Sequence, residues 1–165
     1  MLVYRTGDAT RPDCEGPAII AHLCNDQGAW GRGFVMALSA RWPQPEAAYR
    51  QWASSGMWQD EPFGLGAVQA VTLPDTPWIV ANMVAQHGLG PHNGVPPIRY
   101  GALETCLHKL QKLARLHAAS LHMPRIGCGL AGGQWERVEP LIVKLLSDFE
   151  VVVYDLAAPA SEVGP

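Results

Sequence analysis

The amino-acid sequence predicts an α/β domain with a largely parallel or mixed sheet covered by helices. Three observations support this fold class. Apolar runs typical of strands alternate with segments of helical periodicity through most of the chain. The 165 residues, 48% of them hydrophobic, are enough for one domain with one well-formed core. No repeat and no linker interrupts the pattern, so we expect one domain over residues 1–156 and a flexible tail over 157–165.

The expected strands are short apolar runs bounded by turn residues. In chain order they cover residues 2–5, 18–24, 67–73, 78–84, 121–126 and 151–154. The run from Ala18 to Cys24 is almost continuously apolar, which is typical of a central strand covered on both faces.

The expected helices lie between these strands and after the glycine-rich loops. They cover residues 34–38, 45–54, 103–117 and 135–147. Pro43 ends the first helix because proline cannot continue the hydrogen-bond ladder, and Pro45 suits the first turn of the second. In the third helix, apolar residues recur at steps of three and four. The preceding segment, 86–97, is rich in glycine and proline and predicts either a lid or a disordered loop.

Charge and composition exclude several classes of partner. Twelve Lys and Arg against 15 Asp and Glu give a formal charge of -3, so we expect no broad surface for nucleic acid or an anionic membrane. No run reaches the roughly 18 apolar residues of a membrane span, and residues 1–8 lack the apolar centre of a signal peptide. The cysteines form no CxxC pair, which predicts reduced thiols in the cytoplasm. They are Cys14, Cys24, Cys106 and Cys128.

Two strands end in glycine-rich loops that are each followed by a helix. Residues 25–33 follow the second strand, and residues 127–133 follow the fifth. Glycines expose backbone N–H groups that bind phosphate oxygens, and ligands of such sheets lie outside the carboxyl ends of the strands. Two loops of this kind at one site suit a diphosphate. For either loop alone, glycines that only form tight turns are the alternative.

The second loop also matches the dinucleotide-binding pattern G-x-G-x-x-G, with Asp155 farther along the chain. We reject this interpretation because only one more strand follows, so the second half of a dinucleotide-binding sheet cannot form. The chain contains no G-x-x-x-x-G-K-[ST], which excludes a P-loop as well.

Four segments together resemble the macrodomain family. They are HLCN at 22–25, GAWGRGF at 28–34, MPRIGCGL at 123–130 and QW at 134–135. The resemblance extends over residues 2–156 and is strongest to the branch of the terminal ADP-ribose protein glycohydrolases and the DNA ADP-ribosyl glycohydrolases. HLCN and GAWG are also similar to the ADP-ribose-1''-phosphate phosphatases. The resemblance implies a three-layer fold, with a central mixed six-stranded sheet flanked by helices and a cleft for ADP-ribose at its crest.

The resemblance also implies roles for individual residues. Asp8 would accept a hydrogen bond from the adenine amino group beside the Ala9 amide, and the segment from Tyr154 to Leu156 would lie near the adenine. Asn25 would hold the distal ribose. The phosphates would be bound by the backbone amides of Gly31, Arg32, Gly33, Phe34, Gly127, Cys128, Gly129, Leu130 and Ala131.

Several of these side chains allow two interpretations. His22, in an apolar strand, is either a base facing the ligand or a core histidine with satisfied hydrogen bonds, and we favour the second. Trp30 lies in the binding loop and is expected to line the pocket. Arg32 either reaches a phosphate or substrate protein or is an exposed residue at a helix start. Cys128 is interpreted as a small residue on a phosphate loop rather than a nucleophile.

The chain departs from the family at two catalytic positions. In the terminal ADP-ribose glycohydrolases a lysine near the end of the fourth strand attacks the distal ribose, and an aspartate follows Gly-Cys-Gly-Leu. Here these positions hold Gln86 and Ala131, and the three lysines are expected on helices. We therefore expect water to attack the ribose. Asn25, Gln86 and His87 are the catalytic candidates, with Asp26 beside them.

The function that this pattern favours is hydrolysis of mono-ADP-ribosyl groups, mainly from esters of Asp or Glu and with thymidine in DNA as a further candidate. An ADP-ribose-1''-phosphate phosphatase and a non-catalytic ADP-ribose reader are the alternatives. The expected partners are ADP-ribose, ADP-ribosylated protein and, as a further candidate, ADP-ribosylated DNA. We expect no membrane partner, no cofactor and no metal, because the loop histidines lack companion ligands.

Overall fold

The computed structural model describes residues 1–157 and contains the expected mixed sheet. Its six strands are β1 (Leu2–Thr6), β2 (Ala18–Asn25), β5 (Val68–Thr72), β6 (Trp78–Gln86), β7 (Ser120–Met123) and β8 (Val151–Asp155). They lie in the order β1-β8-β7-β2-β6-β5, and all neighbours are parallel except β5 and β6. A separate hairpin consists of β3 (Met57–Trp58) and β4 (Glu61–Pro62).

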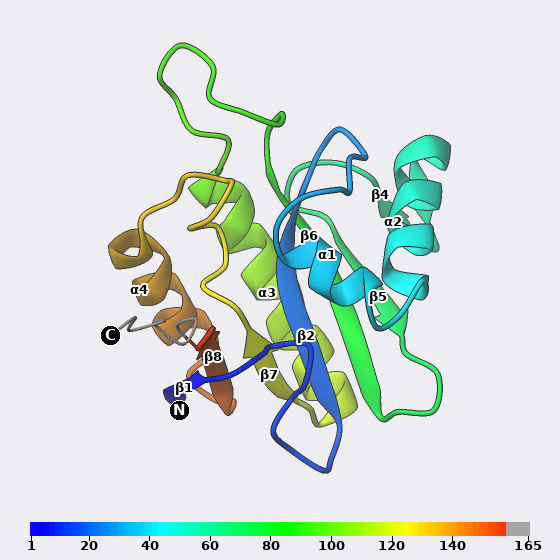
Figure 1. The fold of residues 1–165 in the computed structure, drawn as a ribbon, viewed down its shortest axis with the longest axis vertical. Helices are drawn as coiled ribbons and strands as arrows, with labels where there is room; N and C mark the ends of the chain where they lie inside the picture. Colours follow the sequence, from blue (N-terminus) through cyan, green and yellow to red (C-terminus); the bar gives the residue numbers. More distant parts are fainter. Residues whose placement is uncertain (158–165) are drawn as a thin grey trace, which may run out of the picture.

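Helices cover both faces of this sheet, which gives the three layers that the sequence predicts (Figure 1). The helices α1 (Phe34–Ser39) and α2 (Gln44–Ser55) pack on one face, and α3 (Tyr100–His117) and α4 (Trp135–Leu145) pack on the other. Within β2, Ile19 belongs to the core under α3 and α4, whereas Ile20 belongs to the core under α1 and α2. Burial of both faces explains why β2 is apolar at almost every position.

The structure corrects several details of the expected elements. α3 begins at Tyr100 rather than at residue 103. β7 ends at Met123 rather than at residue 126, because Pro124 has no N–H for the ladder. α4 ends at Leu145 rather than at residue 147. The β3–β4 hairpin has strands of two residues, which are too short to show a period in the sequence. Most of the expected tail, residues 158–165, lies outside the described part of the chain. Within residues 1–157, no helix has the length and apolar character that a membrane crossing requires.

The sheet opens at one end between its central strands β2 and β7. Their pairing covers only Ala18–Ile20 and Ser120–His122, whereas β2 continues along β6 as far as Asn25. The chain leaves β2 toward α1 on one face and leaves β7 toward α4 on the other (Figure 1). Adjacent parallel strands whose next helices lie on opposite faces form the topological switch point at which ligands of α/β sheets bind.

Candidate functional site

A cavity of about 780 Å³ opens at this end of the sheet, between the loops that follow β2 and β7. The predicted site residues in its lining are His22, Asn25, Trp30, Gly31, Arg32, Gly33, Phe34, Gln86, Gly127, Gly129, Leu130 and Ala131. The structure therefore brings both glycine loops and the ends of β2 and β6 to one cavity. The lining also includes side chains to which the sequence assigned no role, among them Arg50, Leu89 and Arg125.

The other predicted site residues lie outside this lining. They are Asp8, Ala9, His87, Cys128 and Leu156. Asp8 Oδ1 accepts hydrogen bonds from the N–H and the hydroxyl of Thr10, both at 2.8 Å. Ala9 is buried, whereas Leu156 is 80% exposed. The residues that the resemblance assigns to the adenine are thus not part of the cavity.

The first glycine loop is shaped by the side chain of Asn25. Its Oδ1 accepts hydrogen bonds from the N–H groups of Gln27 (2.9 Å) and Ala29 (3.1 Å), and its Nδ2 donates to Ala29 O (2.8 Å). The fully buried Tyr49 on α2 donates its hydroxyl proton to Asn25 O at 2.6 Å. Burial raises the pKa of Tyr49, which keeps that proton in place. One N–H of Nδ2 is left for a ligand.

Arg50, the next residue on α2, holds the same loop from its outer side. Its Nη2 donates to Trp30 O at 2.9 Å and its Nη1 to Gly28 O at 3.3 Å, while its Nε pairs with Glu46 at 2.9 Å. Each of the two loop contacts joins residues that are 20 or 22 positions apart in the sequence, so no local sequence pattern reveals them.

The second glycine loop approaches the first across the cavity. Gly33 has a φ of 79°, and a Cβ atom there would lie 3.3 Å from Cδ1 of Leu130. Gly127 has a φ of 76°, and its Cβ would lie 2.5 Å from Cδ1 of Ile98. Both loops therefore require glycine for backbone conformation and close packing, whatever they bind.

The cavity presents unused hydrogen-bond donors and positive charge. Backbone N–H groups of the following lining residues donate to no other residue in the described chain: Gly31, Arg32, Gly33, Gly129, Leu130 and Ala131. The charged side chains of the lining are Arg32, Arg50 and Arg125, and no carboxylate from residues 1–157 belongs to it. Arg50 pairs with Glu46 and Arg125 pairs with Asp155, so Arg32 is the lining arginine without an ion-pair partner among the described residues. This combination suits an anion with several acceptor oxygens.

His22 lines the cavity from β2 but is only 2% exposed. Its Nε2 lies 2.5 Å from Asn82 Oδ1. Asn82 Nδ2 donates to Pro45 O and Gln69 Oε1, so its Oδ1 is the acceptor and Nε2 of His22 carries the proton. Burial lowers the pKa of His22 to about 4 and outweighs the raising effect of the Asn82 hydrogen bond. His22 is therefore neutral at pH 7.

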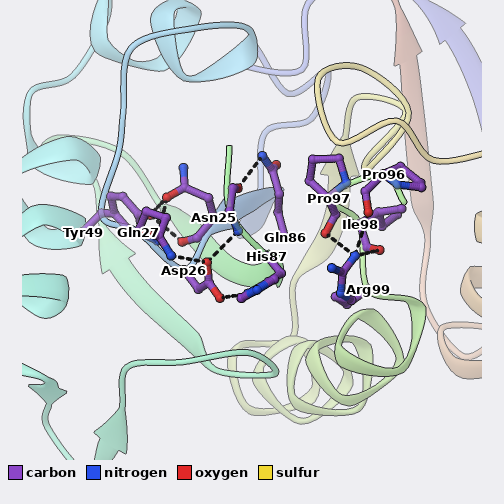
Figure 2. Close-up of polar contacts among 11 residues, drawn as sticks. Asn25, Asp26, Gln27, Tyr49, Gln86, His87, Pro96, Pro97, Ile98 and Arg99 are labelled. Carbon is purple, nitrogen blue, oxygen red and sulfur yellow. Dashed lines mark hydrogen bonds and ion pairs between the residues drawn. The ribbon is translucent and has the colours of Figure 1, made fainter. Parts of the chain in front are cut away.

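Gln86 and His87 are neighbours at the end of β6 whose side chains point in different directions (Figure 2). Gln86 lines the cavity. Its Nε2 donates to Gly88 O at 3.3 Å, and its Oε1 has no hydrogen-bond partner among the described residues. His87 has a side chain that is 57% exposed and lies 2.6 Å, through Nδ1, from Asp26 Oδ2. Of the two, Gln86 is the residue in position to contact a ligand.

Arg125 forms the wall of the cavity beyond β7. Its Nε and Nη2 donate to the two carboxylate oxygens of Asp155 at 2.7 and 3.0 Å. Its guanidinium lies 5.1 Å from the ring centre of Tyr4 and 5.2 Å from that of Trp135. Asp155, which the dinucleotide pattern would assign to a ribose, is thus committed to Arg125. These partners lie on β1, β8 and α4, so the contact is not readable from the local sequence.

The lysines are placed as the sequence predicts. Lys109 and Lys112 lie on α3 and Lys144 lies on α4, and none of them lines the cavity. Over the part of the chain that the structure describes, no group of three or more His, Cys, Asp or Glu side chains is arranged to hold a metal ion.

Comparison with known proteins identifies the class that this fold and cavity define. No protein-family model matches the chain. A macrodomain protein from Streptomyces coelicolor is 50% identical, with a TM-score of 0.80 over 94% of this chain and 99% of that chain. A protein of unknown function from Bacteroides thetaiotaomicron is 48% identical, with a TM-score of 0.88 over 94% and 98%. The chain belongs to the macrodomain family.

Curated relatives include two proteins that are named for reactions of ADP-ribose compounds. Chromodomain-helicase-DNA-binding protein 1-like from Mus musculus is 34% identical over 96% of this chain, which spans 18% of that protein's length. The DNA ADP-ribosyl glycohydrolase of Mycobacterium tuberculosis is 25% identical over 93% of this chain and 42% of its own length. The ADP-ribose 1''-phosphate phosphatase of Scheffersomyces stipitis is 24% identical over 93% of this chain and 99% of its own length.

Proposed function

We propose that the protein binds ADP-ribose in the cavity and hydrolyses mono-ADP-ribosyl groups from ester linkages on Asp or Glu side chains. One observation carries the proposal: two sets of unpartnered backbone N–H groups line a single cavity, together with Arg32 and with no carboxylate from the described chain. A diphosphate satisfies such donors. The names of the mycobacterial glycohydrolase and the yeast phosphatase support ADP-ribose as the carrier of that diphosphate.

The proposed orientation of the ligand follows from which donors are free. With the diphosphate between the glycine loops, the distal ribose lies toward the ends of β2 and β6, where Asn25 and Gln86 line the cavity. The free N–H of Asn25 Nδ2 donates to a ribose hydroxyl. The rest of the Asn25 amide is occupied by its own loop, so Asn25 acts as a rigid donor.

The chemical step is an attack by water, since no lysine reaches the cavity. The water oxygen forms a bond to C1'' of the distal ribose, while the bond from C1'' to the ester oxygen breaks and its electron pair leaves with the carboxylate. The free Oε1 of Gln86 accepts a hydrogen bond from the water and orients it. The released proton passes to a phosphate oxygen of the substrate and then to solvent. The carboxylate is a good leaving group, so the barrier is modest, and positioning of the water supplies the rate acceleration.

The test incubates the protein with a Glu-linked mono-ADP-ribosylated protein and measures the release of ADP-ribose. Gln86→Leu removes the water-orienting oxygen at similar volume, and we expect its kcat to fall by about 10- to 100-fold. Gln51→Leu is the matched control, because Gln51 is an exposed residue of α2 outside the cavity. Gly33→Glu places a carboxylate between the glycine loops and should abolish both binding and release. Equal rates for wild type and Gln86→Leu would remove Gln86 from the mechanism.

Alternative substrates and a non-catalytic role are tested with the same protein preparations. The similarity to a yeast-type phosphatase over 99% of that enzyme favours ADP-ribose-1''-phosphate as a second substrate, so the release of inorganic phosphate is measured in parallel. Thymidine-linked ADP-ribosyl DNA is included because of the similarity to a DNA ADP-ribosyl glycohydrolase. Binding of ADP-ribose that Gly33→Glu abolishes, without turnover of any of the three substrates, would identify a non-catalytic reader.

A further inference from the structure

We infer that Asp26 is a positioning residue that fixes Gln86 against the cavity without touching the ligand itself. The inference rests on the function proposed above, because it assigns to Asp26 a part in orienting the attacking water. Asp26 lies directly after β2 and does not belong to the cavity lining. Its side chain is 14% exposed, and it faces the end of β6 (Figure 2).

Asp26 binds three consecutive residues at the end of the neighbouring strand β6 and directly after it, Gln86, His87 and Gly88. Its backbone N–H donates to Gln86 O at 2.9 Å. Its Oδ2 lies 2.6 Å from Nδ1 of His87, and its Oδ1 accepts the N–H of Gly88 at 2.8 Å. Gln86 is therefore held through its own carbonyl group and through both residues that follow it.

These contacts occur where the regular pairing between β2 and β6 ends. Cys24 pairs with Val84, but the next residue of β2, Asn25, pairs with Gln86, so Ala85 is skipped in the register. A bulge of this kind bends the strand and redirects the side chain that follows it. Beyond the bulge, β2 and β6 share no further ladder pairs. The three contacts of Asp26 therefore replace the β2–β6 ladder pairs at Gln86, where the backbone sets the direction of the Gln86 side chain.

The opposite side of the same segment is held as well. His87 N donates to Pro97 O at 2.8 Å, and Arg99 N donates to Ala85 O at 2.8 Å. Nη1 of Arg99 donates to Pro96 O at 2.6 Å, which closes the base of the long loop (Figure 2). Gln86 thus lies in a segment fixed from two sides, and on the β2 side Asp26 supplies the fixing contacts.

The carboxylate of Asp26 is ionised at neutral pH. Desolvation alone would raise its pKa, but the hydrogen bonds from Gln27, Gly88 and His87 together outweigh that effect and lower it. Its acceptor capacity is largely used by these three donors. This occupancy and the distance from the cavity argue against Asp26 as the base that takes the water proton.

The test is a double-mutant cycle on ester hydrolysis with Asp26→Ala and Gln86→Leu. If Asp26 acts through Gln86, Asp26→Ala alone should lower kcat by about 10- to 50-fold with KM within about threefold, since misplacement of an orienting group costs this much. In the Gln86→Leu background the same change should alter kcat by less than about twofold. Fully multiplicative effects in the cycle would overturn the inference.

Two variants separate positioning from folding. Asp26→Asn keeps an oxygen for Gly88 N–H and gains an N–H for the ring nitrogen of His87, so it should recover most of the lost kcat. Asp148→Ala is the control for loss of a surface carboxylate, because Asp148 forms only a 3.6 Å pair with Arg115. Should Asp26→Ala fail to fold, Asp26→Ser takes its place, because its shorter hydroxyl does not reach His87.

A measurement without turnover keeps the two proposals distinguishable. The side-chain amide signals of Gln86, assigned by their absence in Gln86→Leu, are recorded by NMR with and without ADP-ribose. In Asp26→Ala these signals should shift and broaden, while those of Gln51 stay unchanged. A wild type that cleaves no ADP-ribosyl substrate would contradict the proposed function alone. Gln86 signals that are identical in wild type and Asp26→Ala would overturn the inference, whether or not the protein turns over.

Discussion

Replacing His22 with glutamine should remove a large part of the pH dependence of folding. His22 is 2% exposed, its Nε2 proton is committed to Asn82, and its Nδ1 is buried with no partner in the described chain. Protonation would place a charge and an N–H without an acceptor beneath Trp30, whose ring centre lies 5.5 Å away. Burial therefore lowers the pKa of His22 from 6.5 to about 4.

The sign and the size of the effect follow from this pKa. Between pH 6.5 and 4 the unfolded chain binds the proton and the folded chain does not, so the free energy of unfolding falls as the pH falls. The contribution of neutral His22 to the free energy of unfolding is complete above pH 6.5 and lost below pH 4. A pKa gap of about 2.5 corresponds to about 3.4 kcal/mol in total, and about 2.5 kcal/mol of it is lost between pH 7.5 and pH 4.5.

The assay is urea unfolding from pH 4.5 to pH 7.5 for wild type, His22→Gln and the control His108→Gln. His108 is exposed on α3 and differs from His22 only in its surroundings. We expect the stability difference between wild type and His22→Gln to change by about 2.5 kcal/mol across this range. The contribution of the other histidines cancels in the difference. Parallel pH curves for wild type and His22→Gln would refute the argument.

Two further predictions concern the glycine loops. A Cβ at Gly133 would press on Gly127 O, a backbone atom that cannot move aside, so Gly133→Ala should destabilise the protein by about 2 to 3 kcal/mol. Gly129→Ala, in the same loop with no atom within 4 Å, should cost under about 0.5 kcal/mol, and equal midpoints in urea would contradict this. Tyr49→Phe removes the hydroxyl that donates to Asn25 O and should cost about 1 to 2 kcal/mol. Calorimetric titration with ADP-ribose should also show weaker binding of this variant, and an unchanged affinity would show that Asn25 does not need that support.

The fold was predictable where a residue's neighbours in sequence decide its structure. The apolar run of β2 and the three- and four-residue spacing of apolar residues in α3 are local patterns, and the structure confirms both elements. The glycine loops could be placed at the cavity because each follows a parallel strand directly. The end of β7 was wrong by a few residues, because the apolar Ile126 continues the strand pattern although Pro124 has already ended the ladder.

The supports of the site were not predictable, because they are contacts between distant segments. Tyr49 and Arg50 look like ordinary residues of an amphipathic helix, and only the packing of α2 beside β2 brings them to the first loop. Arg125 is part of a recognised motif, yet its partner Asp155 comes from a strand thirty residues away. The position of Gln86 opposite Asn25 depends on a register shift between β2 and β6 that no pattern in the sequence marks.

These supports explain how a site without a strong nucleophile can still favour a reaction. Tyr49 holds the first loop from the protein interior, and Arg50 holds it from the outer side. The free N–H groups of that loop are therefore arranged before a ligand arrives. The entropy of ordering that loop is then a cost of folding and not of binding. The same reasoning applies at the end of β6, where the backbone of Gln86 is held in place before the proposed water meets its side-chain amide. A lysine that forms a covalent bond tolerates some freedom, whereas attack by water depends on alignment. The number of contacts behind Gln86 is therefore what the proposed chemistry requires.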